Sequence, residues 1–233
     1  PDFEVSDTHV LTARVTDHVG ATHDGTVTIT VLDINDRPTI GDYTFRPLEN
    51  QVRGSTMGQV FGADADAGDN ATLVYTLMPE GNGPLDNWFK IDSASGVITT
   101  DTLWLDFETQ EVHTLTVQVE DHVGAADNGT MTIVVLDGND DPSIGDYAFT
   151  TEENRVRGSF IGRVTGRDED VDDNSTLSYS LLAAGNGPSG DWFTIDSTTG
   201  VISTDALIPD FEVSDTHVLT ARVTDHVGAT HDG

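Results

Sequence analysis

Thr-Val-Thr-Ile-Thr-Val-Leu-Asp-Ile-Asn-Asp-Arg-Pro, residues 26–38, joins an alternating apolar stretch to an acidic segment that ends in proline. Apolar side chains at every second position are typical of a β-strand with one buried face. The pattern returns 104 residues later, at residues 130–142, as Thr-Met-Thr-Ile-Val-Val-Leu-Asp-Gly-Asn-Asp-Asp-Pro. A strand that runs into an acidic linker and recurs at the length of a small domain predicts tandem β-domains.

Three further acidic signatures recur with the same period. Asp-His-Val-Gly begins at residues 17, 121 and 225, Asp-x-Asp at residues 64 and 168, and Asp-Phe-Glu at residues 106 and 210. Residues 1–25 are identical to residues 209–233, two periods apart, whereas adjacent repeats differ. This alternation predicts three blocks: the C-terminal part of one domain (1–37), a complete domain (38–141) and a domain lacking its last strand (142–233).

Each period contains several short alternating stretches. Leu73, Tyr75 and Leu77 show the period of two, and Asn-Gly or Gly-Asn-Gly-Pro turns separate such stretches. No apolar stripe has the spacing of a helix longer than about two turns. About seven strands per period predict an all-β protein of tandem seven-stranded Greek-key β-sandwiches.

Composition excludes several classes of function. The 41 acidic residues against 10 Lys and Arg give a formal net charge of −31, which disfavours nucleic-acid binding and attachment to anionic membranes. No apolar stretch is long enough for a membrane helix, so membrane insertion is not expected. The chain has no cysteine and therefore no disulfide staple. Because 36% of the residues are apolar and patterned, we expect a folded protein that neutralises its carboxylates with cations.

Together, these signatures resemble the cadherin repeats, in particular the bacterial cadherin-like domains of large surface adhesins, and the resemblance covers the whole chain. A cadherin repeat carries a Glu after its first strand, an Asp-x-Glu before its sixth strand and an Asp-x-Asn-Asp linker. The next repeat adds an Asp-x-Asp loop, a nearby Asn and an Asp at the end of its sixth strand. The resemblance implies β-sandwiches joined by calcium-binding linkers, with about three Ca²⁺ ions in each complete interdomain junction.

The resemblance also implies which residues bind the metal. In the junction around residues 137–142 they are Glu49, Asp106, Glu108, Asp137, Asn139, Asp140, Asp168, Asp170, Asn174 and Asp225. In the preceding junction they are Asp2, Glu4, Asp33, Asn35, Asp36, Asp64, Asp66, Asn70 and Asp121. Glu153, Asp210 and Glu212 match the start of a third junction. Calcium takes six to eight oxygen ligands in irregular geometry, which suits these carboxylates and amides.

The sequence departs from the family pattern at several positions. The second Asn of the linker is Arg37 in one copy and Asp141 in the next, a position that ligates through its backbone carbonyl in the family. The loop residue Gly68 becomes Asp172. No N-terminal strand with an exchangeable Trp is visible, so strand-swap adhesion is not supported.

Other features leave alternatives open. Trp88 and Trp192 fit core packing or, in a carbohydrate-binding module, a sugar-stacking platform. The eight histidines form no close pair on a helix, which favours loop or edge positions over zinc binding. Asn70, Asn128 and Asn174 begin glycosylation sequons. Repetition of the acidic pairs in every domain argues against an active site, so we expect no enzyme.

The sequence therefore predicts an extracellular, calcium-rigidified tandem array at a cell surface or in secreted form. It would act as the extender of a surface adhesin or as the subunit of a surface filament. The alternatives are a carbohydrate-binding module and a homophilic calcium-dependent cell–cell adhesion domain. The expected partners are neighbouring repeats, other copies bound head to tail and a surface or matrix polysaccharide. In head-to-tail binding, residues 26–33 of one copy would supply the strand that residues 142–233 lack.

Overall fold

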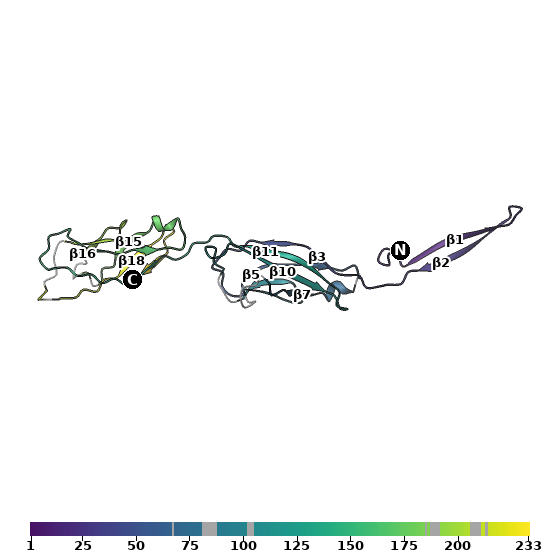
Figure 1. Ribbon diagram of the computed structural model, residues 1–233, viewed down its shortest axis with the longest axis horizontal. Coiled ribbons are helices and arrows are strands. Elements are labelled where there is room, and N and C mark those ends of the chain that lie inside the picture. Colours follow the sequence, from purple (N-terminus) through teal and green to yellow (C-terminus); the bar gives the residue numbers. More distant parts are fainter. Residues whose placement is uncertain are drawn as a thin grey trace. The chain divides into compact units, whose positions relative to one another are not determined.

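The computed structural model describes residues 1–66, 68–80, 88–101, 105–184, 186, 192–205, 211–212 and 214–233 (Figure 1). The chain divides into two units, Pro1–Leu136 and Asp137–Gly233. Among the described residues, the helical ones form two short 3₁₀ turns, and the other regular elements are strands. The expected all-β class is confirmed.

The first unit contains a two-layer sandwich. One sheet has the order β4-β11-β10-β7 and the other the order β5-β9-β8. The strands of the first sheet are β4 (Tyr43–Phe45), β7 (Val74–Leu77), β10 (Val112–Glu120) and β11 (Ala126–Val134). Those of the second are β5 (Thr56–Gln59), β8 (Phe89–Ile91) and β9 (Val97–Thr100). Two short strands, β3 (Thr39–Ile40) and β6 (Gly62–Ala63), pair with each other.

Seven strands emerge when interrupted pieces are joined. Only Gly41 and Asp42 separate β3 from β4, and only Val60 and Phe61 separate β5 from β6. In the described part of residues 39–134, these two composite strands and β7 to β11 make the seven-stranded sandwich that the sequence predicts. β10 and β11 form a long antiparallel ladder, while β4 adds in parallel to the outer edge of β11.

The core of this sandwich lies between the two sheets. It contains the inward side chains of the predicted alternating strands: Leu73, Tyr75, Leu115, Val117, Val119, Met131 and Ile133 from the first sheet, facing Phe89 and Ile98 from the second. Val117 and Val119 are fully buried, with no exposed surface. The buried face holds the register, because a slip of one residue would turn every apolar side chain to solvent.

The second unit repeats this plan. It contains β12 (Ser143–Ile144), β13 (Phe160–Arg163), β14 (Gly166–Arg167), β15 (Ser178–Leu181), β16 (Phe193–Ile195), β17 (Val201–Thr204), β18 (Ala221–Thr224) and β19 (Thr230–Asp232). The sheets have the orders β13-β17-β16, β15-β18-β19 and β12-β14. Val164, Leu177, Ile202 and Val223 occupy the centre of its core.

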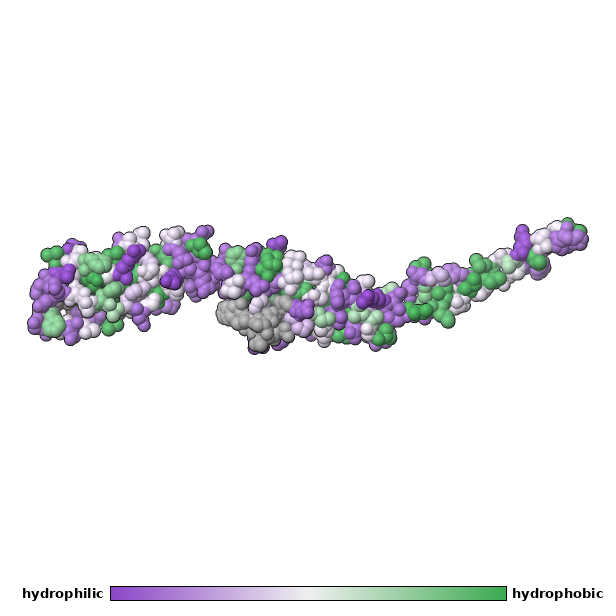
Figure 2. All heavy atoms as spheres, viewed as in Figure 1, coloured by the Kyte–Doolittle hydropathy of each residue, from purple (hydrophilic) through white to green (hydrophobic). Residues whose placement is uncertain are grey.

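Residues 1–37 contain a β-hairpin of β1 (Thr8–Thr16) and β2 (Thr22–Thr30). Its register, Thr8↔Thr30 to Thr16↔Thr22, corresponds to that of β10 and β11. The apolar residues expected to be half-buried on this hairpin, such as Leu11 and Val15, are 53% and 67% exposed. Figure 2 shows this apolar surface as green spheres along the hairpin. The pattern therefore forms the two strands, although no described part of the chain covers their apolar face. The domain boundaries at residues 37/38 and 141/142 stay predictions.

Candidate metal centres

Two equivalent acidic sites lie at the ends of the sandwich strands, one in each unit. Site 1 comprises Asn35, Asp36, Asp64, Asp66, Asp69, Asn70 and Asp121, and site 2 comprises Asn139, Asp140, Asp168, Asp170, Asp173, Asn174 and Asp225. In both, a pair of linker residues meets the loop after a short strand and the residue that directly follows β10 in the first unit or β18 in the second. These positions include six of the implied ligands of each junction.

The linker contacts site 1 through two hydrogen bonds. The Asp36 backbone N–H donates to Asp66 Oδ2 over 2.8 Å, and Asn35 Nδ2 donates to Asp121 Oδ2 over 2.9 Å. The Asn35 bond lowers the pKa of Asp121, aided by the backbone N–H groups of the loop that follows. Asp121 is therefore held ionised, as a metal ligand requires.

The Asp-x-Asp loop is shaped by Asn70. Its Oδ1 accepts the Asp64 backbone N–H over 2.9 Å, and its Nδ2 donates to the Asp64 carbonyl over 2.7 Å. The Asp66 N–H in turn donates to Asp64 Oδ1 over 2.9 Å. Because both ends of the Asn70 amide bind the backbone, this side chain organises the loop. The matching bonds between Asn174 and Asp168 measure 3.0 and 2.7 Å.

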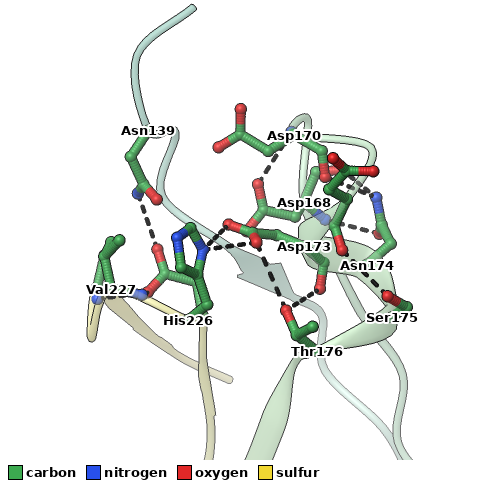
Figure 3. Close-up of polar contacts among 12 residues, drawn as sticks. Asn139, Asp168, Asp170, Asp173, Asn174, Ser175, Thr176, His226 and Val227 are labelled. Carbon is green, nitrogen blue, oxygen red and sulfur yellow. Dashed lines mark hydrogen bonds and ion pairs between the residues drawn. The ribbon is translucent and has the colours of Figure 1, made fainter.

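Site 2 shows the same contacts (Figure 3). Asn139 Nδ2 donates to Asp225 Oδ2 and the Asp140 N–H donates to Asp170 Oδ2, both over 2.8 Å. Burial raises the pKa of Asp168, and the charges of neighbouring carboxylates act in the same direction. Burial also tends to raise the pKa of Asp225, but the Asn139 amide and three backbone N–H groups hold it below its ordinary value. The carboxylates of site 2 therefore lie close together and partly shielded from water, which disfavours their charged forms.

Sequence reasoning missed one carboxylate in each site. Asp69 and Asp173 are buried, and their carboxylates accept from His122 Nδ1 and His226 Nδ1. Ligand atoms of Asp64, Asp66 and Asp69 lie within 4.8 Å of one another, as do those of Asp168, Asp173 and Asp225. The Asp69–His122 pair recurs 104 residues later as Asp173–His226, and this recurrence could have identified the buried carboxylate from the sequence.

The donor set fits a hard cation. Asp64 and Asp168 are only 7% and 8% exposed, and Oδ2 of each has no hydrogen-bond partner within the part of the chain that the structure describes. A buried carboxylate oxygen without a donor is unfavourable unless a proton or a cation compensates it. Oxygen-only donors on an irregular loop suit calcium better than a transition metal.

The remaining implied ligands of the first junction lie near site 1. Ligand atoms of Glu4, Asp33 and Asp66 fall within 4.8 Å of one another. Asp2 accepts the Glu4 backbone N–H over 3.1 Å. A backbone hydrogen bond lowers the pKa of Glu4, but desolvation and the carboxylates of Asp2 and Asp36 outweigh it, so the pKa is raised. These acids repel one another without a cation.

Other implied ligands lie at the opposite end of each sandwich. Glu49 is 3% exposed and its Oε2 accepts the Phe107 N–H over 2.7 Å, which fixes it beside the Asp106–Glu108 segment. In the second unit the Glu153 carboxylate makes the matching contact to the Phe211 N–H over 3.4 Å, next to Glu212. Asp210 lies outside the described residues. Burial, with Asp170, Asp140 and Asp172, raises the pKa of Asp137 at the start of the linker.

The two tryptophans pack against the cores of the sandwiches, which is the core-packing alternative of the sequence analysis. Trp88 and Trp192 are partly buried against the two cores, and each meets a histidine edge to face at 4.9 Å between ring centroids: His113 for Trp88 and His217 for Trp192. The structure gives the polysaccharide partner no support.

The comparisons agree with this geometry. The sequence profile described as "Cadherin domain" matches residues 43–136 and 147–232. The chain belongs to the cadherin family. Cadherin repeats serve in calcium-dependent adhesion and extracellular extension, cadherin domains in general bind calcium, and their proteins lie at the cell surface. In the described residues, no helix is long and apolar enough to span a membrane.

Individual relatives are large animal cadherins. The chain is 30% identical to human Protocadherin Fat 1 over 96% of its own length and 5% of that protein. It is 34% identical to Drosophila melanogaster Protein dachsous over 87% of its length and 6% of that protein. Among solved structures, the extracellular cadherin domains 1–5 of Protocadherin Gamma B2 match all of the chain and 45% of that structure, with a TM-score of 0.64 and 26% identity. Repeats EC22–24 of mouse Cadherin-23 match all of it and 74% of that structure, with a TM-score of 0.64 and 25% identity.

Proposed function

We propose that this cadherin segment is a calcium-rigidified extender within an extracellular tandem array. The observation that carries the proposal is the equivalence of sites 1 and 2, each with a buried carboxylate oxygen that no hydrogen-bond donor in the described residues satisfies. Calcium would compensate these oxygens and join the linker to the loop and the strand end. The linker, free to bend without metal, would then be fixed, with about three ions per complete junction.

The domain blocks 1–37, 38–141 and 142–233 belong to this proposal, as do the implied ligands. Placement of the array on a large bacterial surface adhesin, or in a surface filament, is also part of it. The relatives reported above are animal proteins, and the chain covers only 5% and 6% of their length. They therefore do not decide between these two placements. The whole protein is proposed to be a structural protein and no enzyme.

Calcium titration calorimetry together with small-angle scattering tests the proposal. In chelator-treated protein, added calcium should bind with saturation and narrow the distribution of chain dimensions. Asp140→Ala should weaken both effects, whereas Glu152→Ala, at an exposed acid outside the sites with a side chain 87% exposed, should change neither. Absence of calcium binding in the wild-type chain would refute the proposal.

Homophilic adhesion is the second candidate, because the cadherin fold is used for calcium-dependent adhesion. A purely structural extender should remain monomeric in saturating calcium, whereas a homophilic domain should self-associate. Sedimentation velocity over a wide range of concentrations, with and without chelator, separates the two. A strictly monomeric chain at high concentration would also rule out head-to-tail binding through residues 26–33.

A further inference from the structure

One tyrosine in each unit contacts both chain segments that lead to the buried acids of its metal site. In the first unit this residue is Tyr75, which lies in β7 and is 7% exposed. Its hydroxyl accepts the Gly62 backbone N–H over 2.9 Å, two residues before Asp64. Its backbone pairs with Val119 of β10, two residues before Asp121. The side chain and the backbone of one residue therefore hold both segments at once.

The segment that leads to Asp64 depends on this hydroxyl because its own strand is short. β6 consists of Gly62 and Ala63 alone, and it pairs with the two residues of β3. A Cβ at Gly62 would meet Val119 Cγ2 at 2.7 Å, so the backbone here packs directly on a core side chain. A backbone N–H that loses its partner in such a place is unfavourable. Loss of the hydroxyl would therefore favour a displaced backbone in which this N–H binds water.

The second unit repeats the arrangement. The Tyr179 hydroxyl accepts the Gly166 N–H over 3.0 Å, two residues before Asp168. The Tyr179 backbone pairs with Val223, two residues before Asp225. A Cβ at Gly166 would meet Val223 Cγ2 at 2.7 Å, the same distance as in the first unit. Ligand atoms of Asp168 and Asp225 lie within 4.8 Å of each other, so the tyrosine holds the approach to two acids that meet.

We propose that Tyr75 and Tyr179 are positioning residues for calcium, each acting on its own site through the backbone and not on the ion. The inference rests on the proposed function, since it takes sites 1 and 2 to be calcium sites. Without the hydroxyl, the loop that contains Asp64 or Asp168 would adopt the binding geometry for only a fraction of the time. The apparent Kd for calcium rises as that fraction falls.

Phenylalanine variants test the proposal because they remove only the hydroxyl. The full chain, labelled for NMR and treated with chelator, is titrated with calcium while the amide signals of Asp66 and Asp170 report on sites 1 and 2 separately. Tyr75→Phe should raise the Kd measured at Asp66 by about twofold to tenfold, the equivalent of one hydrogen bond. The Kd measured at Asp170 should stay as in the wild type. Tyr179→Phe should have the reverse effect.

The matched controls are buried threonines in the other sheet of each unit. The Thr100 hydroxyl accepts the Ser55 N–H and donates to the Val52 carbonyl, both over 3.1 Å. The Thr204 hydroxyl makes the matching bonds in the second unit. Thr100→Val and Thr204→Val therefore remove a hydroxyl that also binds the backbone, but outside the sites. Each should lower Tm in chelator and leave the Kd of the site in its own unit unchanged.

Hydrogen exchange in the wild-type chain gives a second measurement that needs no variant. If the hydroxyl bond and the ion stabilise the same backbone geometry, each strengthens the other, because such coupling is reciprocal. Calcium should therefore slow exchange at the Gly62 and Gly166 amides by a larger factor than at the Ser55 amide, which the Thr100 hydroxyl holds.

The possible results distinguish this inference from the proposed function. No calcium binding in the wild-type chain would refute the proposed function and, with it, the inference. Saturable binding whose Kd neither tyrosine variant changes would overturn the inference and leave the extender function standing. Equal weakening of both sites by one variant would overturn it as well. If a tyrosine variant does not fold, hydrogen exchange decides, and equal slowing at Gly62, Gly166 and Ser55 would overturn the inference.

Discussion

At the scale of single residues, the carboxylates of sites 1 and 2 differ in the hydrogen-bond donors that stabilise their charge. Asn35 and Asn139 hold the carboxylates of Asp121 and Asp225 ionised by direct hydrogen bonds. The Oδ2 atoms of Asp64 and Asp168 receive no such bond from the described residues. This uneven supply of donors separates carboxylates that hydrogen bonds already stabilise from those whose charge a bound cation would compensate.

His113 gives a residue-scale prediction of pH dependence. It is 4% exposed between Trp88 and Phe89, and desolvation lowers its pKa below the ordinary 6.5, although a backbone hydrogen bond at Gln110 partly opposes the shift. As pH falls below about 6.5, the unfolded chain takes up a proton that the folded chain resists, so stability falls until the lower folded pKa is reached. Above about 6.5 the residue has no effect.

His113→Leu should therefore reduce the fall in Tm between pH 7.5 and pH 5. Calorimetry measures Tm in saturating calcium, so that the carboxylates of sites 1 and 2 contribute equally in the wild type and the variant. The exposed His23, changed to Leu, is the control and should leave the fall as it is in the wild type. An unchanged slope in His113→Leu would show that burial of His113 does not contribute to the acid sensitivity.

At the scale of elements, turns between strands require particular residues. Gly96, between β8 and β9, has φ +71°, a left-handed conformation that favours glycine. A Cβ there would lie 2.4 Å from the Val60 carbonyl oxygen, which belongs to the backbone and cannot turn aside. Gly200 repeats both features against Val164 in the second unit.

Gly96→Ala should destabilise the first unit by about 2–4 kcal/mol, combining left-handed strain with a backbone clash. Urea unfolding followed by Trp fluorescence measures this. Gly41→Ala is the control, because its Cβ would meet nothing within 4 Å and its φ is outside the left-handed range; it should cost less than about 1 kcal/mol. Equal losses in both variants would contradict the argument.

The two long hairpins give a second prediction for elements. β1–β2 and β10–β11 have corresponding registers, but the apolar face of β10–β11 is buried and that of β1–β2 is exposed. Since burial rather than pairing supplies most of the stability, amides of β1–β2 should exchange with deuterium at least about a hundredfold faster. Hydrogen-exchange mass spectrometry compares them within one sample. Similar protection would show that another copy covers the hairpin in solution.

At the scale of the whole molecule, the net charge of −31 makes salt a stabilising agent. In chelator, raising KCl from about 10 mM to about 0.3 M should raise Tm, because screening weakens repulsion among the carboxylates. With saturating calcium the increase should be smaller. Thermal scans in both conditions test this, and an equal salt effect with and without calcium would place the repulsion outside the sites.

The alternating pattern of residues such as Leu73 and Tyr75 was enough to predict the sandwich, because one buried face fixes both period and register. The resemblance identified Asp64, Asp66 and Asn70, which the structure brings together with Asp36. Three features needed coordinates. Asp69 was missed because its importance comes from its burial beside His122. The exposure of Leu11 could not be predicted because alternation does not show whether another part of the chain covers the strand. The edge-to-face packing of Trp88 depends on His113, which is distant in sequence.

The identical segments 1–25 and 209–233 make the same cross-strand ion pair, Arg14 with Asp24 and Arg222 with Asp232, each with bonds of 2.6 and 2.8 Å. The intervening repeat has Gln118 and Asn128 there instead. Identical segments in a tandem protein can exchange strands during folding, because each fits the other's sheet. Here they are separated by a domain whose strands carry a different pair. Alternation therefore protects folding fidelity, since the nearest strand in sequence is also a poorer substitute.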